Sequence, residues 1–587
     1  MVISVKRFCI GLLIAVLMCS LMACGKKNAS SAPHSTPDGS QLEGSPSTVG
    51  SVDVTTTAAD DADKSNSDTS ANTQTGSHIA TEGTTTANKT TTETTTKSTT
   101  QTTTSTTVAA VQLSWSLPIY EGGTPAQELY DCGGGKDMGG TSQAQMLVIS
   151  NTTREQFDAY LAKMKKVDYK EIARNTEFEN VYVQYYRETD KHLVYIYFLS
   201  ELGEVRIIED KASVSEPAFE YTCTAGDVTV YQYAFMQDGQ AMNIEPWYEI
   251  NGMFYIIRLA DNRLICVDGA TAGLQATQTA ATELWRFMQE ITGSDKVRIA
   301  CWYITHPHGD HYGFLQQLLQ QDMADKVTVE RVMYNFNNPG LIADTDATAL
   351  GRLLAERLPN ALYLKPHTGQ KITLGNVDID VLFTHEDYVD PTTGETMITQ
   401  ANNVSTIVRV HLNGRTMLLT GDWSGGGGSV APSEYPEGVR RLLLMHTNDD
   451  NDSYLKNDIY QISHHGLNTY TAILTSEVAA EYAFVPAPDA DLDTRRNVEP
   501  AANVRQFVAA GGDSDQVYFT NRYTYALHIS RQGKITVAAE PIRGVDTGDD
   551  PKTAFVEEDY RNITLKKRNP YRVPTEEELS NWKKIHL

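Results

Sequence analysis

The feature that most constrains this chain is a dense run of metal-binding side chains, His306–His311, with the sequence HPHGDH. The run follows an apolar stretch, residues 297–304, that is typical of a buried strand. Histidines one residue apart in an extended segment point to the same side, and Asp310 and His311 can turn back toward the same centre. Imidazole and carboxylate groups at this density suit two divalent cations with a water between them. The run therefore predicts a dinuclear metal centre at the end of a strand.

The N-terminal residues have the pattern of a signal peptide followed by a flexible linker. Residues 1–24 hold two basic residues, a short apolar run and small residues before Cys24, the pattern of a bacterial lipoprotein signal peptide. Cys24 would then become the lipidated first residue; an ordinary secretory signal with Cys24 incidental is the alternative. Residues 25–111 are rich in Ser and Thr, and a flexible disordered linker of this length spans about 50 Å. We expect a protein on the extracytoplasmic face of the cell membrane, held by its lipid anchor only.

The net charge bears on nucleic-acid binding, and the cysteines bear on disulfides and zinc sites. The formal net charge of −25 disfavours a protein that holds long nucleic acid, because phosphate binding needs a basic surface. Nucleic acid is thus a possible but not a favoured partner, and no protein partner is evident. Cys266 and Cys301 lie in apolar stretches and are expected in the core, and no cysteine spacing indicates a disulfide framework or a cysteine zinc site.

The folded part divides into two predicted domains and a tail. In residues 112–215, Thr153 and Gln156 form a capping-box pattern before a helix, and three strand-like runs follow. This small α+β domain shows no catalytic constellation, and its tyrosines fit either a core or a ligand face. In residues 216–541, strands and helices mix as in an α/β fold of two packed sheets flanked by helices, an αββα sandwich. Residues 542–587 are a polar tail.

Four stretches give residues 216–541 a resemblance to the metallo-β-lactamase fold superfamily. They are Cys266–Gly269, His306–His311, the Asn402–Ser405 run that leads to Leu418–Asp422, and Ser463–Gly466. Within the superfamily, the chain resembles the hydrolase domain of competence DNA-uptake channel proteins and the phosphorylcholine esterases of bacterial surfaces.

The resemblance implies a ligand set for two divalent ions, zinc or manganese, with iron also possible. In that set His306 and His308 bind the first ion, Asp310 and His311 bind the second, Asp422 bridges both, and His465 completes the second. His464 would then contact the substrate or protonate the leaving group, and Asp310 would also be catalytic. The sequence alone does not decide which histidine of the pair is the ligand.

Three further polar positions accompany this set. Asp268 lies too early to be a ligand and either holds a ligand histidine through a hydrogen bond or serves as a turn residue. Many relatives carry another histidine where this chain reads Ala401–Ser405. His385 is a possible replacement for that histidine. The lack of a histidine at 401–405 argues against β-lactam hydrolysis. Asn402 or Asn403 orients substrate oxygens or only caps a strand, and we assign Asn403 the catalytic role.

Taken together, the sequence favours a surface-anchored hydrolase in which a hydroxide formed between two metal ions attacks the substrate. A phosphodiesterase acting on a small-molecule or cell-surface phosphodiester is the first hypothesis. One alternative is an extracytoplasmic nuclease whose basic groove uses Arg440, Arg441, Arg495 and Arg496. Another is a lipoprotein that binds a cell-surface polymer through residues 112–215.

Overall fold

The structure is a computed structural model. It describes residues 111–541 except 114–116, 135–143, 211–215, 238–239, 242–251, 272–277, 321–325, 339–347, 426–436, 449–451, 467–471, 487–502, 505 and 521–522. The predicted signal peptide, Cys24, the linker up to residue 110, the tail from 542, Arg495 and Arg496 lie outside the described residues.

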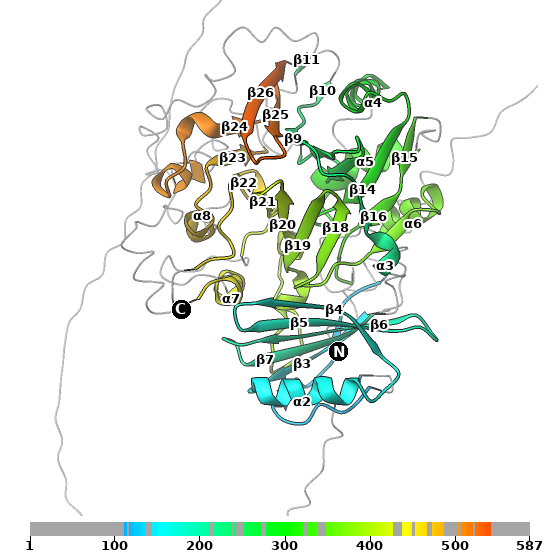
Figure 1. Cartoon of the computed structure of the whole chain (residues 1–587), viewed down its shortest axis with the longest axis vertical. Coiled ribbons are helices and arrows are strands. Elements are labelled where there is room, and N and C mark those ends of the chain that lie inside the picture. The colour runs from blue at the N-terminus through cyan, green and yellow to red at the C-terminus, as the bar shows by residue number, and fades with distance from the viewer. Residues whose placement is uncertain are drawn as a thin grey trace, which may run out of the picture. The chain divides into compact units, whose positions relative to one another are not determined.

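The N-terminal part forms an antiparallel sheet with one long helix on its outer face (Figure 1). The strands are β1 (Thr124–Pro125), β2 (Tyr130–Asp131), β3 (Ala144–Ser150), β4 (Lys170–Glu177), β5 (Asn180–Arg187), β6 (His192–Leu199) and β7 (Glu204–Asp210). Their order is β1-β3-β7-β6-β5-β4, with β2 also paired to β3. Helix α2 (Arg154–Met164) begins at the Thr153 capping box, as the sequence predicts.

This N-terminal sheet is buried on both faces. Phe157, Tyr160 and Leu161 of α2 pack on one face, against a set that includes Val183 and Ile196. On the opposite face, tyrosines of β5 and β6 belong to the large core that continues into the rest of the chain; they are Tyr182, Tyr195 and Tyr197. Every residue of β6 is accordingly buried, which a strand covered on one face only would not show. These three tyrosines are therefore core residues and do not form an exposed ligand face.

Two mixed sheets make up the rest of the fold. The first has the order β17-β16-β14-β13-β12-β9-β25-β26, with β15 paired to β14. Its strands are β9 (Val228–Gln232), β12 (Tyr255–Arg258), β13 (Leu264–Val267), β14 (Val297–Tyr303), β15 (Val327–Val329), β16 (Arg331–Met333), β17 (Leu362–Leu364), β25 (Tyr523–Ile529) and β26 (Ile535–Pro541). The second has the order β24-β23-β22-β21-β20-β19-β18-β8. Its strands are β8 (Tyr221–Thr222), β18 (Lys371–Gly375), β19 (Val377–Phe383), β20 (Ile407–Leu412), β21 (Arg415–Leu419), β22 (Ile459–Gln461), β23 (Tyr482–Val485) and β24 (Val517–Phe519).

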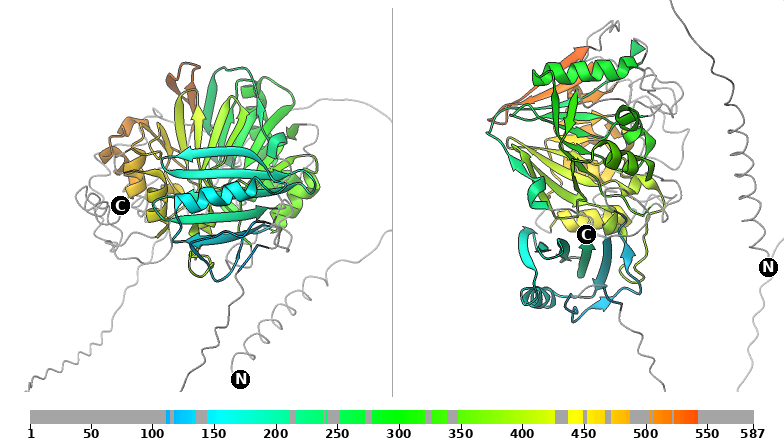
Figure 2. Two further views of the ribbon diagram at one scale, coloured as in Figure 1. Left: turned by 60° about the horizontal axis from the view of Figure 1, so that its bottom comes forward. Right: turned by 90° about the vertical axis from the view of Figure 1, so that its right-hand side faces the viewer.

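An apolar core joins these two sheets, and helices lie outside them (Figure 2). Val230 and Ile257 of the first sheet share this core with Ile379 and Val408 of the second. The helices are α3 (Glu216–Phe219), α4 (Gln278–Thr292), α5 (Gly309–Gln320), α6 (Thr348–Arg357), α7 (Glu437–His446) and α8 (Ala472–Val478). The mixed α/β class with two packed sheets, predicted from the sequence, is confirmed.

Two local features position the residues that follow β14. The strands β15 and β16 are separated by Glu330 and pair with successive parts of β14. Helix α5 begins at Gly309, so that Asp310 and His311 lie in its first turn. Cys266 and Cys301 are buried free thiols, as expected. Among the described residues, no helix has both the length and the apolar character needed to cross a bilayer.

Candidate metal centre

The predicted ligands meet at the carboxyl ends of strands from both mixed sheets. His306 and His308 follow β14, and the next turn of chain opens α5 with Asp310 and His311. Asp422 follows β21, which pairs in parallel with β22, and the His464-His465 pair follows β22. Because parallel neighbours end at the same edge of a sheet, the loops after β21 and β22 lie together.

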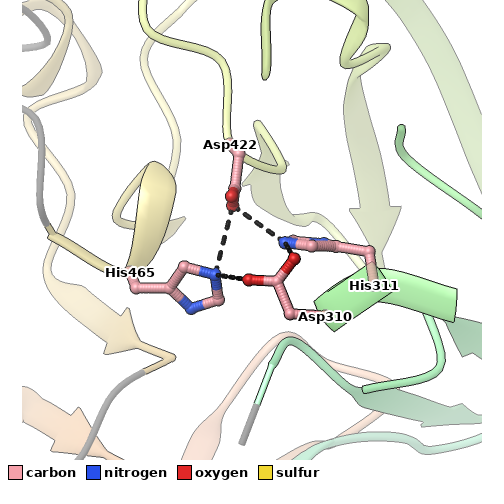
Figure 3. A group of neighbouring side chains, drawn as sticks. All are labelled: Asp310, His311, Asp422 and His465. Carbon is pink, nitrogen blue, oxygen red and sulfur yellow. Dashed lines mark ion pairs between the residues drawn. The ribbon is translucent and has the colours of Figure 1, made fainter. Parts of the chain in front are cut away.

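One group of four side chains is arranged around a common point (Figure 3). Its members are Asp310, His311, Asp422 and His465, each offering one ligand atom within 4.8 Å of the others. His311 Nε2 lies 3.1 Å and His465 Nε2 lies 3.5 Å from Asp422 Oδ1. His465 Nε2 is also 3.3 Å from Asp310 Oδ2. Two imidazoles and two carboxylates match the donor set of a zinc or manganese site.

A second group shares Asp422 with the first. His306, His308 and Asp422 offer ligand atoms within 4.8 Å of one another. Here it is the other carboxylate oxygen that faces the histidines: His306 Nε2 lies 3.8 Å from Asp422 Oδ2. One oxygen of Asp422 thus belongs to each group, which is the arrangement a bridging carboxylate needs.

The hydrogen bonds around the centre fit metal ligation. Nε2 of His306, His311 and His465 and Oδ1 of Asp422 are buried without a hydrogen-bond partner in the described part of the chain. The other ring nitrogen is engaged in each case: His465 Nδ1 donates to the Pro486 carbonyl at 2.6 Å, and His311 Nδ1 donates to Asp268 at 2.6 Å. Such outer hydrogen bonds fix the tautomer that leaves Nε2 free to bind a metal. Unpaired polar atoms at this depth are costly, so their convergence indicates a ligand.

Asp268 accepts three hydrogen bonds behind the ligand histidines. Its Oδ2 accepts from His311 Nδ1 and from Thr305 Oγ1, at 2.6 and 2.9 Å, and its Oδ1 accepts from the Thr305 amide at 2.7 Å. The residue is fully buried and has a φ of 61°, in the left-handed region. The structure thus places Asp268 behind a ligand histidine, and that carboxylate also fixes the strand end that carries His306.

The backbone at the centre is tightly restricted. His464 and His465 both have left-handed φ values, 51° and 53°, which are uncommon for residues with a Cβ. Gly421, at φ 55°, brings the chain so close to Thr305 that a Cβ would lie 2.8 Å from its hydroxyl. Gly252 allows a similar approach, since a Cβ there would overlap the carbonyl oxygen of Asp310.

The carboxylates and histidines of the centre stabilise one another's charge. Burial raises the pKa of Asp422, but His311, His465 and His464 outweigh it and hold that pKa well below its usual range. Burial lowers the pKa values of His311 and His465, but Asp422 and its neighbours outweigh it and raise both. Burial is the main cause that lowers the pKa of His306, which stays neutral. Because a neutral imidazole is the form that binds metal, an incoming ion would displace the protons of His311 and His465.

His464 differs from its neighbour. It lies outside both ligand groups, is the more exposed member of the pair, and its Nε2 is 3.9 Å from Asp422 Oδ2. Asn402 Nδ2 lies 3.1 Å from the same nitrogen and holds the ring in place. The geometry therefore groups His465 with the ligands and leaves His464 beside them, partly exposed.

The catalytic role assigned to Asn403 stays a prediction, and its Nδ2 is buried without a hydrogen-bond partner among the described residues. Its side chain is fully buried, and Oδ1 accepts hydrogen bonds from the amide and the hydroxyl of Ser424, at 3.1 and 2.8 Å. It supports the loop that follows Asp422. Asn402, which contacts His464, is the asparagine nearer the reacting groups.

Two other expectations are corrected. His385 is not a replacement ligand, because Nδ1 bonds to Tyr130 and Nε2 to Asn335, both at 2.9 Å. Arg441 does not line a basic groove, because it is buried and paired with Glu204. Arg440 is paired with Glu437 on the same helix. His367 is buried between Glu386 and Asp210.

The sequence alone did not identify the residues whose hydrogen bonds hold the ligand-bearing segments in position. The Ser405 hydroxyl accepts a hydrogen bond from the Asp422 amide at 3.1 Å, and Gln461 Oε1 accepts one from the Thr420 amide at 2.7 Å. Their only signal is a small or amide side chain next to a ligand segment, which is too common to single out. The contact between Asn402 and His464 joins loops 62 positions apart, so no local pattern could reveal it.

The fold and this paired ligand set define a metal-dependent hydrolase. Residues 252–464 match the family model described as the metallo-beta-lactamase superfamily, so the chain contains a domain of that superfamily. The matched range includes every predicted ligand except His465, which immediately follows it.

Several solved structures are similar to this chain at low identity. CmlA, a diiron beta-hydroxylase from Streptomyces venezuelae, is 13% identical with a TM-score of 0.29, covering 51% of this chain and 54% of its own. A diphosphatase from the PhnP family is 11% identical with a TM-score of 0.25, covering 44% and 85%. Zinc-bound PqqB from Methylobacterium extorquens is 8% identical with a TM-score of 0.28, covering 50% and 98%. The chain thus spans about half the length of CmlA. No curated protein sequence matches the chain.

Proposed function

We propose that this hydrolase is a phosphodiesterase with a dinuclear centre, anchored at the outer face of the cell membrane. The observation that carries the proposal is the division of the Asp422 carboxylate between two ligand groups, with one oxygen facing each. Two cations so placed suit a substrate that carries a negative charge spread over adjacent oxygens, as a phosphodiester does.

The bound ions would activate a water and neutralise charge on the substrate oxygens. Side chains around the ions would orient the ligand rings and transfer a proton. Asp268 and the Pro486 carbonyl orient the rings of His311 and His465. We assign to His464, which is held by Asn402 and partly exposed, the transfer of a proton to the departing alkoxide oxygen. That step matters for a diester, because an alkoxide is a poor leaving group without a proton.

The surface location rests on the sequence alone. Residues 1–24 with Cys24 support a lipid anchor, and the Ser/Thr-rich linker would hold the enzyme away from the membrane. A substrate outside the cytoplasm follows from that location, either a small molecule or a decoration of the cell surface. The resemblance to the competence proteins and the phosphorylcholine esterases stays a prediction.

The proposal is tested by comparing three chromogenic substrates with the manganese- or zinc-loaded full chain: bis(p-nitrophenyl) phosphate, p-nitrophenyl acetate and a chromogenic cephalosporin. We expect turnover of the phosphodiester, removed by a chelator and restored by the metal. Turnover of the acetate or the cephalosporin in preference to the phosphodiester would overturn the choice of substrate class.

A further inference from the structure

A cleft of about 230 Å³ lies where the N-terminal sheet meets the second mixed sheet. One wall comes from the end of β4, its turn and β5, including Asn175, Glu177 and Tyr182. The other comes from β18, β19 and a later loop, including Lys371, Asp380 and Tyr454. No predicted metal ligand lines it. Drug-sized sites occupy about 300–1,000 Å³, so this cleft suits a ligand of roughly one ring.

The walls of the cleft are held rigidly. Asn175 Nδ2 donates to the Gly369 carbonyl at 2.8 Å, which ties the N-terminal sheet to the start of β18. Tyr182 packs on Gly369 so closely that a Cβ at that glycine would overlap its ring. On the opposite side, Tyr454 donates to Asp380 Oδ2, and His411 Nε2 lies 2.7 Å from the same oxygen. A preformed cleft binds small ligands without the cost of ordering its walls.

The lining combines flat aromatic rings with planar polar groups. The partly exposed Tyr454 supplies aromatic surface, the 5% exposed Tyr182 backs the cleft, and the carboxylates of Glu177 and Asp380 supply hydrogen-bond acceptors. One oxygen of each carboxylate is engaged, Glu177 Oε1 by His446 at 2.6 Å and Asp380 Oδ2 by Tyr454. Of their second oxygens, Asp380 Oδ1 lies 4.0 Å from Lys371 Nζ, beyond hydrogen-bond distance, and Glu177 Oε2 makes no hydrogen bond with the described residues. A ligand with several hydroxyl donors would satisfy them.

The charge of the lining disfavours an anion. Each carboxylate of the cleft is paired with a basic side chain: Glu177 with His446, and Asp380 with His411 and the half-exposed Lys371. Because these charges balance, the described lining offers no excess positive charge to attract a phosphate or an acidic peptide. A pyranose ring has the opposite properties: apolar C–H faces that pack on tyrosine rings, a rim of hydroxyl donors, and no charge.

We propose that this cleft between Tyr182 and Tyr454 binds one uncharged pyranose unit of a glycan. The site goes beyond the proposed hydrolysis and does not depend on it. On a surface enzyme, it would hold a polymer while the metal centre acts on a phosphodiester attached to the same polymer or nearby.

The test is saturation-transfer NMR on the full chain with methyl glucoside and N-acetylglucosamine, in the presence of EDTA so that hydrolysis plays no part. We expect saturation transfer to at least one sugar, with a Kd on the order of 1 mM. Thr176 is exposed on the edge strand β4 and lines the cleft, so Thr176→Trp would fill it, while Thr176→Val is the matched control. Lys371→Trp blocks the cleft from the opposite wall.

Both tryptophan variants should lose saturation transfer by at least about tenfold in affinity, and Thr176→Val should retain it. Circular dichroism and thermal midpoints check that each variant is folded. The proposal is overturned if neither sugar shows transfer at about 10 mM, or if the folded tryptophan variants bind as the native chain does. Displacement of the sugar by inorganic phosphate would also overturn it, because it would mark an anion site.

Discussion

Replacing Glu204 with glutamine should strongly destabilise the contact between the N-terminal sheet and the mixed sheets. Glu204 lies between two buried guanidinium groups: Arg206 Nη2 is 2.9 Å away, and Arg441 Nη1 and Nη2 are 3.0 and 2.6 Å away. All three side chains are at most 4% exposed. Glu204→Gln keeps the shape and removes the charge, so that buried Arg206 loses its ion pair and buried Arg441 keeps only Glu437, 3.9 Å away.

Two routes give a similar size for this effect. Breaking a buried ion pair by removing one partner costs about 3–5 kcal/mol. Burial raises the pKa of Glu204, but Arg206 and Arg441 outweigh it and lower that pKa from 4.5 to about 2. At about 1.4 kcal/mol per pKa unit, this corresponds to about 3 kcal/mol. We expect the free energy of unfolding to fall by about 3 kcal/mol at neutral pH.

The measurement is urea denaturation followed by circular dichroism, read as the midpoint at unchanged m-value. Glu201→Gln is the matched control, because Glu201 is exposed three positions earlier, and it should change stability by less than about 0.5 kcal/mol. If Glu204→Gln costs no more than this control, the buried pair does not join the two parts of the fold.

Three further outcomes are expected. Burial lowers the pKa of His367, but Glu386 and Asp210 outweigh it and raise that pKa to about 9. The pairing therefore stabilises the fold fully below about pH 6.5, and urea midpoints should fall as the pH rises through about 9. The variant His367→Gln should remove this pH dependence. Asp268→Asn should weaken metal affinity about 10–100-fold, measured by competition with a chromogenic chelator, and unchanged affinity would refute its link to His311. With an alkyl phosphodiester, whose leaving alkoxide needs a proton, His464→Ala should lower kcat about 10²–10⁴-fold at full metal content by elemental analysis; loss of an ion in this variant would make His464 a ligand.

The sequence was most informative where chemistry and local geometry coincide. The run His306–His311 predicts a metal centre because its four ligand residues lie within six consecutive positions, and the structure brings them together with Asp422. The mixed α/β fold was predictable for a related reason, since buried strands such as β14 are apolar along their length.

What the sequence could not indicate depends on contacts between distant segments. The burial of Tyr195 and Tyr197 follows from a second covering layer that strand periodicity does not reveal. Arg441 looked available for a basic groove because its partner Glu204 is 237 positions away. His385 looked like a ligand for the same reason: Tyr130, which engages its Nδ1, is 255 positions earlier.

The most direct test of the central claim is a metal titration of the apo full chain with bis(p-nitrophenyl) phosphate as substrate. If Asp422 bridges two ions, hydrolysis should rise with added manganese or zinc until two equivalents are bound, and Asp422→Ala should lose the activity. Hydrolysis that is complete at one equivalent, or that persists in metal-loaded Asp422→Ala, would contradict a dinuclear phosphodiesterase bridged by this carboxylate.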